Sequence, residues 1–187
     1  MIYLLIVIIA LTLIINLTLF VFFIVHSFCY RHDITSHPKA IFYLHEIIKQ
    51  NQLTEKSFVD LGCAWGSLSF QTKNKYPNLN IIAIDNSYFR IFICKLLNFL
   101  KKRKIKFIHQ NIYSFDFSKA DIFYSYLWYT EMEMLEKKFL TEAKPQSLLI
   151  TNDTSLPNLK PKKIITLHTK KQNSEKIFVY KKQNLTT

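Results

Sequence analysis

The pattern of apolar and polar residues divides the chain into segments of different character. Residues 1–25 contain no charged side chain and are dominated by Leu, Ile, Val and Phe. About 20 apolar residues suffice to cross the hydrocarbon core of a bilayer. The stretch is apolar on every side, whereas a helix at the surface of a soluble protein has one polar face. The pattern therefore predicts a transmembrane anchor over residues 1–28.

Two other interpretations compete for this stretch, a secretory signal peptide and a buried core helix. A signal peptide begins with basic residues and ends at a cleavage site with small residues, and neither feature surrounds this stretch. The uninterrupted apolar character on every side argues against a buried core helix. Positive charges begin only after the stretch, at Arg31 and Lys39. The positive-inside rule then predicts a single-pass membrane protein whose remaining domain faces the cytoplasm.

Residues 29–56 are predicted to form a juxtamembrane segment and an amphipathic helix. Ile41, Leu44 and Ile48 recur at helical spacing. Ser36 is expected to cap this helix, with Pro38 in its first turn. We expect the helix to run from residue 36 to about residue 50, the range over which the period is that of a helix.

From residue 57 onward, short apolar runs alternate with longer helical patterns. The predicted strands cover residues 57–61, 80–85, 106–112, 121–127 and 147–152, and the predicted helices cover residues 66–76, 88–102 and 130–143. This alternation is typical of a parallel α/β sheet. The runs at 163–169 and 176–181 alternate apolar with polar residues around 170–174, which predicts an antiparallel hairpin. The fold class is thus a Rossmann-like, seven-stranded, mostly parallel sheet in a domain spanning residues 57–187.

The only two glycines of the chain, Gly62 and Gly66, lie where the first strand meets the first helix. Such a loop holds a nucleotide-type cofactor over the carboxyl ends of the strands. Asp85 follows about 20 residues later at the end of the next strand, where an acid can accept from both ribose hydroxyls. A dinucleotide prefers G-x-G-x-x-G, which is absent. The acidic Asp60 inside the loop suits a cationic cofactor, and S-adenosylmethionine carries a sulfonium and an ammonium.

The stretch Val59–Gly66, with Asp85 and Asn111 behind it, resembles the class I S-adenosylmethionine-dependent methyltransferases. The resemblance covers residues 35 to 183. It implies S-adenosyl-L-methionine as cofactor, with the loop around its methionine part, an acid on its ribose and a polar residue at its adenine. The implied cofactor-binding residues are Asp60, Gly62, Cys63, Ala64, Trp65, Gly66, Asp85, Asn86, Asn111 and Ile112. The chain departs from the family at Ala64, where glycine is commonest, and at Asn111, where aspartate is usual.

The order of an apolar span, a helix and this core is also similar to the membrane-anchored protein-lysine methyltransferases. Members of that group methylate the ATP synthase c-subunit and the adenine nucleotide translocase. The resemblance implies a membrane-protein substrate and places residues 125–130 beside the transferred methyl group. Tyr126, Trp128 and Tyr129 are then expected to line the acceptor site, where aromatic rings can cage an ammonium; packing is the other role open to them. The sequence assigns no catalytic residue.

Alternatives to lysine methylation remain open. The enzyme could methylate a lipid or a small molecule, or the domain could bind the cofactor without turning it over. The formal net charge of +12 permits a nucleic-acid partner, which the lack of a recognised nucleic-acid module disfavours. An anionic lipid surface fits the basic stretch from Lys160 to Lys182. The histidines and the three cysteines show no metal-ligand spacing, so no metal is expected.

Overall fold

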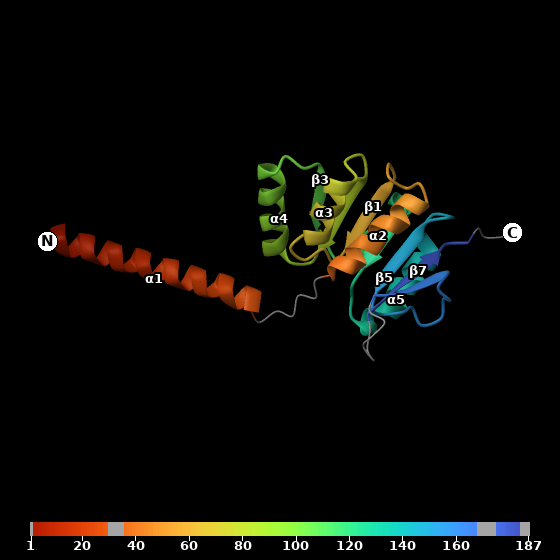
Figure 1. Ribbon diagram of the computed structural model, residues 1–187. Coiled ribbons are helices and arrows are strands. Elements are labelled where there is room, and N and C mark those ends of the chain that lie inside the picture. Colours follow the sequence, from red (N-terminus) through yellow and green to blue (C-terminus); the bar gives the residue numbers. More distant parts are fainter. Residues whose placement is uncertain (1, 30–35, 168–174, 184–187) are drawn as a thin grey trace. The chain divides into compact units, whose positions relative to one another are not determined.

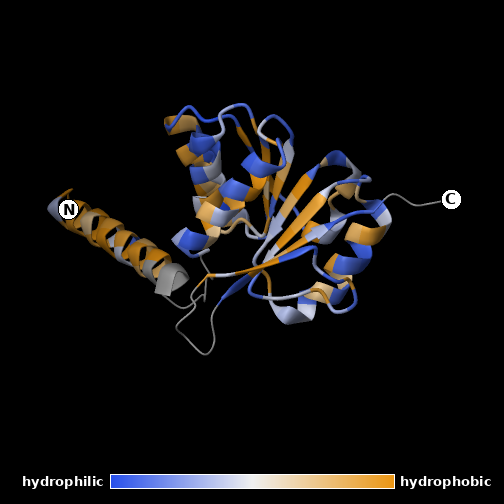
Figure 2. Cartoon of the chain, turned by 45° about the vertical axis from the view of Figure 1, so that its right-hand side comes forward, coloured by the Kyte–Doolittle hydropathy of each residue, from blue (hydrophilic) through white to orange (hydrophobic). Residues whose placement is uncertain are grey.

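The computed structural model describes residues 2–29, 36–167 and 175–183. The chain forms two compact units, residues 1–34 and residues 35–187. The first unit contains helix α1 (Ile2–Cys29) (Figure 1). Its stretch Ile2–Ile24 is long and apolar enough to cross a membrane, by length and composition. Figure 2 shows hydrophobic colouring over most of this helix.

The polar side chains within α1 bond back to the helix that carries them. The Thr12 hydroxyl donates to the carbonyl oxygen of Ile9 at 2.8 Å, and the Asn16 amide donates to that of Thr12 at 2.8 Å. The Thr18 hydroxyl donates to the carbonyl oxygen of Ile14 at 2.5 Å. In a hydrocarbon environment each polar group must find a partner within the protein. These three side chains find theirs within α1 itself, so they need no second helix.

The second unit is built on a seven-stranded sheet in the order β3-β2-β1-β4-β5-β7-β6. The strands are β1 (Ser57–Leu61), β2 (Asn80–Asp85), β3 (Ile105–His109), β4 (Ile122–Ser125), β5 (Leu148–Asn152), β6 (Lys163–Thr166) and β7 (Lys176–Lys181). Strands β1 to β5 run parallel, and β7 inserts antiparallel between β5 and β6. The predicted fold class is therefore confirmed. The strand order reverses between β1 and β4, which is where ligands bind in open α/β sheets.

Helices cover both faces of the sheet (Figure 1). Helices α2 (Pro38–Gln50), α3 (Ser67–Lys75) and α4 (Tyr88–Leu100) pack on one face, and α5 (Met132–Glu142) packs on the other. Neighbouring strand residues alternate between the two hydrophobic clusters: Phe58 belongs to the first, and Val59 to the second. Both faces of the central strands are thus buried, which explains their nearly continuous apolar sequences.

Several element ends differ from the sequence-based prediction. The prediction that Ser36 caps α2 is wrong. His37 is the N-cap and accepts from the amide of Lys39 at 3.1 Å, because the Ser36 hydroxyl bonds to the hydroxyl of Tyr124 at 2.6 Å instead. Strand β3 ends at His109, before a 3-10 turn at Ile112–Ser114.

Strand β4 ends at Ser125 rather than residue 127. Helix α5 begins at Met132 after a 3-10 turn at Tyr129–Glu131. Another 3-10 turn covers Phe117–Lys119. The predicted hairpin turn at 170–174 lies outside the described residues.

Candidate active site

The β1–α3 loop depends on its two glycines for both conformation and space. Gly62 and Gly66 have φ angles of +79° and +73°, in the left-handed region that side chains disfavour. A Cβ atom at Gly62 would lie 3.0 Å from the Leu127 side chain, and one at Gly66 would lie 3.0 Å from the Phe107 ring. The sequence therefore places glycine where φ is positive and where a Cβ atom would crowd a neighbouring side chain.

The loop is held against the end of β2 by backbone hydrogen bonds. The amides of Gly62 and Cys63 both donate to the carbonyl oxygen of Ile84, at 2.9 and 2.8 Å. Ala64, at the position where the related family most often has glycine, also has a positive φ of 47°. An alanine in this region is strained, so Ala64 retains the backbone shape of a glycine loop at some cost in stability.

Asp60 is a buried acid at the end of β1, with only 4% of its surface exposed. Its carboxylate accepts a hydrogen bond from the Ser69 hydroxyl at 2.6 Å, and among the described residues it has no ion pair. Burial raises the pKa of Asp60 to about 7; the Ser69 bond opposes this shift, and the charge of Asp85 adds to it. A desolvated carboxylate of this kind is complementary to a cationic ligand.

Asp85 lies at the carboxyl end of β2 and joins the loop to the start of α4. Its Oδ2 accepts from the amide of Ala64 at 2.9 Å, and its Oδ1 accepts from the amide of Ser87 at 2.8 Å. The guanidinium of Arg90 lies 3.8 Å from Oδ2. Asn86 beside it is exposed, and its backbone oxygen lies 3.1 Å from Nε2 of His109.

The remaining residues predicted to bind the cofactor surround this core. Asn111 is exposed, and its Oδ1 accepts from the amide of Tyr113 at 2.9 Å, which caps the 3-10 turn that begins at Ile112. Trp65 packs edge-on against Phe89, with ring centroids 6.2 Å apart, and Arg90 lies over its ring. The structure thus gathers the predicted residues of the β1, β2 and β3 ends at one edge of the sheet.

Cys63 is buried in the loop and faces Cys94 of α4. A hydrogen bond to Cys94 and burial raise the pKa of the Cys63 thiol well above its usual range. The Cys94 thiol lies 3.6 Å from the carbonyl oxygen of Ala64. A thiol kept protonated in this way is a poor nucleophile, so Cys63 acts as a small packing residue in the loop.

The three aromatic residues expected at the acceptor side separate in the structure. Tyr126 is half-buried, and burial together with the nearby charges of Glu175 and Asp153 raises its pKa to about 12. Trp128 and Tyr129 are 59% and 75% exposed. The structure therefore brings Tyr126 towards these two acids and leaves the other two rings in solvent.

Sequence reasoning did not single out Asn152, Asp153 or Glu175. Asn152 and Asp153 end β5 at the same edge as the glycine loop. Glu175 directly precedes β7, whose antiparallel direction starts at that edge, since Asn152 pairs with Ile177. The rule that ligands lie at the carboxyl ends of strands could have found the first two. The position of Glu175 could be found only once it was known that β7 pairs antiparallel with β5.

Several polar side-chain atoms buried at this edge have no hydrogen-bond partner among the described residues. Asn152 is fully buried, and neither its side-chain oxygen nor its nitrogen has a hydrogen-bond partner among the described residues. The same holds for the hydroxyl of Ser125 at the end of β4. A buried polar group without a partner costs about 1–3 kcal/mol, so each of these groups calls for a partner such as an ordered water or a bound ligand.

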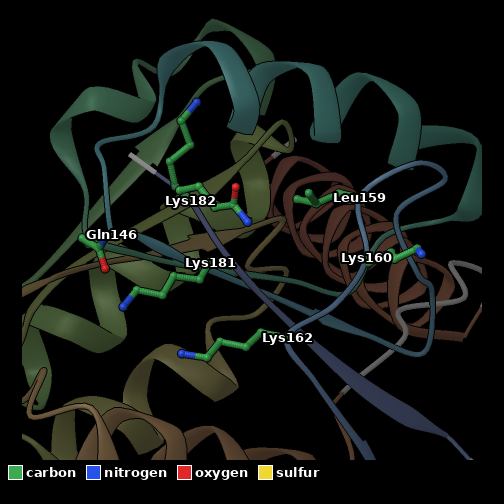
Figure 3. A pocket seen from close by; sticks show the side chains of 7 residues that line it. Gln146, Leu159, Lys160, Lys162, Lys181 and Lys182 are labelled. Atoms are coloured by element: carbon green, nitrogen blue, oxygen red, sulfur yellow. The ribbon is translucent and has the colours of Figure 1, made fainter. Parts of the chain in front are cut away.

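A separate pocket lies at the opposite edge of the sheet (Figure 3). It has a volume of about 450 Å³ and is lined by Gln146, Leu159, Lys160, Lys162, Lys181, Lys182 and Gln183. Lys181 pairs with Leu148, the first residue of β5, so these lysines lie at the amino ends of the parallel strands. The lysines that line this pocket are therefore remote from the glycine loop.

The residues present fit S-adenosylmethionine. The buried Asp60 carboxylate is placed for a cationic methionine part, Asp85 for the ribose hydroxyls, and the side-chain-free backbone at Gly62 for close approach. This site on this sheet defines a Rossmann-like, class I methyltransferase. The model of the ANTKMT methyltransferase domain family matches residues 60–163, more than half of the chain. The chain belongs to this family and is an S-adenosylmethionine-dependent methyltransferase.

Solved structures share the fold at low sequence identity. An RNA methyltransferase from Salinibacter ruber, in complex with S-adenosyl-L-homocysteine, is 10% identical with a TM-score of 0.69, covering 81% of this chain and 95% of its own. A Listeria monocytogenes protein described as a class I S-adenosylmethionine-dependent methyltransferase is 15% identical with a TM-score of 0.63, over 83% and 64%. Coclaurine N-methyltransferase, bound to N-methylheliamine and S-adenosyl-L-homocysteine, is 19% identical with a TM-score of 0.52, over 65% and 38%.

At these identities the likeness establishes the fold alone. No curated protein matches the sequence significantly.

Proposed function

We propose that this protein is a membrane-anchored protein-lysine N-methyltransferase that modifies a lysine of a membrane protein. The observation that carries the proposal is the acidic and aromatic character of the acceptor side, where Glu175, Asp153 and Tyr126 lie together beyond the ends of β4 and β5. An ammonium group is attracted by carboxylates and by the face of a tyrosine ring. The sequence resemblance to protein-lysine methyltransferases supports the same substrate class.

Glu175 is the acid best placed to meet an incoming ammonium. Its charge lies close enough to Tyr124 and Tyr126 to contribute to the raised pKa of both hydroxyls. Its Oε2 atom is buried and has no hydrogen-bond partner among the described residues. A carboxylate oxygen that is out of water and unpaired favours a positively charged partner, and a lysine head group supplies one.

Asn152 supports the acceptor from the floor of the same region. It alternates along β5 with Leu148 and Ile150, which belong to the cluster that contains Tyr124, so it lies on the same face of the sheet as Tyr124. Its free amide can hydrogen-bond the acceptor amine or the peptide backbone that carries it. Such a contact would orient the amine, which is the main requirement in a displacement whose partners need alignment.

When bound, S-adenosylmethionine supplies a methyl group on a sulfonium, which is a good leaving group. The chain must then deliver a neutral amine, because a lysine ammonium with a pKa of about 10.4 has no lone pair to attack with. Glu175 can hold the ammonium and take its proton, while the half-buried Tyr126 ring excludes water beside it. Asp60 keeps the cationic cofactor in place through its buried carboxylate.

Helix α1 supports a membrane location for the enzyme. Its length, composition and internally bonded polar residues suit a membrane span. Tethering an enzyme to a bilayer raises its effective concentration towards substrates in that bilayer. The positive charges that follow the helix favour a cytoplasm-facing domain.

The test is methyl transfer by the full chain in phospholipid nanodiscs, supplied with S-adenosylmethionine carrying a labelled methyl group and with delipidated or intact membrane fractions. We expect label in protein, recovered as methyl-lysine after acid hydrolysis. Glu175→Gln should lower kcat at least tenfold while leaving cofactor affinity unchanged. Glu133→Gln, an exposed acid on α5, serves as the matched control.

Two results would redirect the assignment. Label recovered only in extracted lipid or small molecules would establish methyl transfer but overturn the lysine acceptor. Cofactor binding with no transfer to any fraction would instead favour a binding module without turnover.

A further inference from the structure

Helix α4 exposes a row of large apolar side chains on its outer face. Tyr88, Phe92, Leu96, Phe99 and Leu100 are between 46% and 79% exposed. They recur at spacings of three and four residues and so share one side of the helix. The opposite side carries Ile91 and Cys94, which are buried against the sheet. We call these five exposed residues the α4 stripe.

The α4 stripe is not accounted for by the packing of the domain. Single exposed apolar residues are common on protein surfaces, but a contiguous row of aromatic and aliphatic side chains marks an interaction surface. The inward face of α4 already supplies the contacts that hold the helix to β2 and β3. The stripe is therefore a candidate surface for binding a partner outside the domain.

Positive charge surrounds the carboxyl end of the stripe. A groove of about 570 Å³ is lined by the apolar Phe99 and Leu100 together with Asn98 and the basic Lys95, Lys102, Arg103 and Lys104. None of these four basic side chains forms an ion pair with another described residue. The site thus offers an apolar floor with unneutralised cations at its rim.

We propose that α4 and the basic turn after it bind the surface of an anionic lipid membrane. The α4 stripe inserts at the boundary between head groups and acyl chains, and Lys95, Lys102, Arg103 and Lys104 contact the lipid phosphates. A basic helix with a large aromatic and aliphatic face is the type of helix that lies in this interface. Each basic residue near an anionic surface adds to the attraction between the protein and the lipid phosphates.

The same features argue against other occupants of the α4 stripe. A second copy of this chain, paired face to face through α4, would bring two sets of like charges together, which opposes association. A nucleic acid would match the charges but leave the aromatic and aliphatic side chains in water. An anionic membrane matches the basic charges and also takes the apolar side chains out of water. Helix α1 of the same chain is long and apolar enough to enter a membrane. The inference does not depend on lysine being the methyl acceptor.

Photo-crosslinking from lipids tests the inference on the full chain. The protein is placed in nanodiscs that contain phosphatidylcholine, with or without phosphatidylglycerol, plus a trace of phosphatidylglycerol bearing a diazirine near its head group. Crosslinked peptides are identified by mass spectrometry, and crosslinks within α1 serve as the internal standard. We expect crosslinks in residues 88–104, at several-fold higher yield when phosphatidylglycerol is present.

Variants test whether lipid crosslinking depends on the α4 stripe and its basic residues, or whether any exposed apolar residue would do. Phe92→Ser/Phe99→Ser should lower the yield at residues 88–104 at least fivefold relative to α1, and so should Lys102→Gln/Lys104→Gln. Phe42→Ser, at an exposed phenylalanine on α2, should change nothing. All positions are exposed, so circular dichroism melting should be unaltered. Crosslinks confined to α1, equal yields in the α4 variants, or protein–protein crosslinks joining two α4 helices would each overturn the proposal.

Discussion

The backbone amide of Ala64 donates to Oδ2 of Asp85 at 2.9 Å, so the acid at the end of β2 also shapes the glycine loop after β1. The other carboxylate oxygen accepts from the amide of Ser87. Asp85 therefore fixes the shape of the glycine loop. We expect its remaining lone pairs to accept from the ribose hydroxyls of the cofactor, so that one residue would serve both purposes.

This double role predicts a large effect of removing the acid. In Asp85→Ala the amides of Ala64 and Ser87 lose their acceptor, and hydrogen bonds to charged groups are worth about 1.5–3 kcal/mol each. We expect affinity for S-adenosylmethionine to fall by at least about 100-fold, on the scale of about 1.4 kcal/mol per factor of ten. Isothermal titration calorimetry of the full chain in nanodiscs measures this, with Glu133→Gln as control. Unchanged affinity in Asp85→Ala would remove Asp85 from the cofactor site.

Asp60 predicts a pH dependence of cofactor binding. Because burial raises its pKa to about 7, the carboxyl is mostly protonated at pH 6 and ionised at pH 8. A cationic ligand binds the ionised form, so affinity should rise with pH, by up to about tenfold per unit below the pKa, and level off above it. Asp60→Asn should give a weak, flat profile. A flat profile in the unaltered protein would contradict this role.

The same shift predicts how the unliganded protein responds to pH. The folded pKa of Asp60 lies above its ordinary value of 3.8. Folding therefore favours the protonated carboxyl, and this contribution is lost as pH rises from about 4 through about 7. Thermal unfolding should show Asp60→Asn gaining stability relative to the unaltered protein between pH 5 and pH 8. A constant difference across that range would show that Asp60 is ionised throughout.

Gly62→Ala should destabilise the protein through two separate causes. The residue has a φ of +79°, and its new Cβ would lie 3.0 Å from the side chain of Leu127. We expect a loss of about 1–3 kcal/mol in the free energy of unfolding, as for other residues held in disfavoured backbone regions. Adding Leu127→Ala should remove the steric part. Denaturant unfolding of both variants and of Leu127→Ala alone completes the cycle, and complete additivity would exclude the contact.

Ala64→Gly should not destabilise the protein, in contrast to Gly62→Ala. Ala64 has a φ of 47°, which costs an alanine about 1–2 kcal/mol. Glycine avoids that strain but loses about 0.5–1 kcal/mol through the entropy of the unfolded chain. The free energy of unfolding should therefore stay constant or rise by up to about 1.5 kcal/mol, and cofactor affinity should persist. A clear loss of stability would mean that the methyl group of Ala64 packs usefully in the loop.

Local sequence patterns sufficed to predict the candidate membrane span, the fold class and several residues of the candidate site. The charge-free apolar run marked the candidate membrane span, and the change of period at residue 57 marked an α/β sheet. The carboxyl ends of its parallel strands meet at one edge, so strand order and turn chemistry suffice to assign Asp60, Gly62 and Asp85 to a common site. These conclusions follow from residues close together in sequence, where periodicity and turn chemistry act directly.

Only the tertiary structure decided which residues meet at the proposed acceptor side and which side chains are exposed at the outer surface. Glu175 reaches the site because β7 runs antiparallel beside β5, and Ser36 bonds Tyr124 instead of capping a helix. Trp128 and Tyr129 turn outward although their sequence neighbour Tyr126 does not. Helix α4 is apolar on both sides, so its pattern could not reveal which side would remain exposed. Strand pairing and packing decide these features because they join residues far apart in the chain.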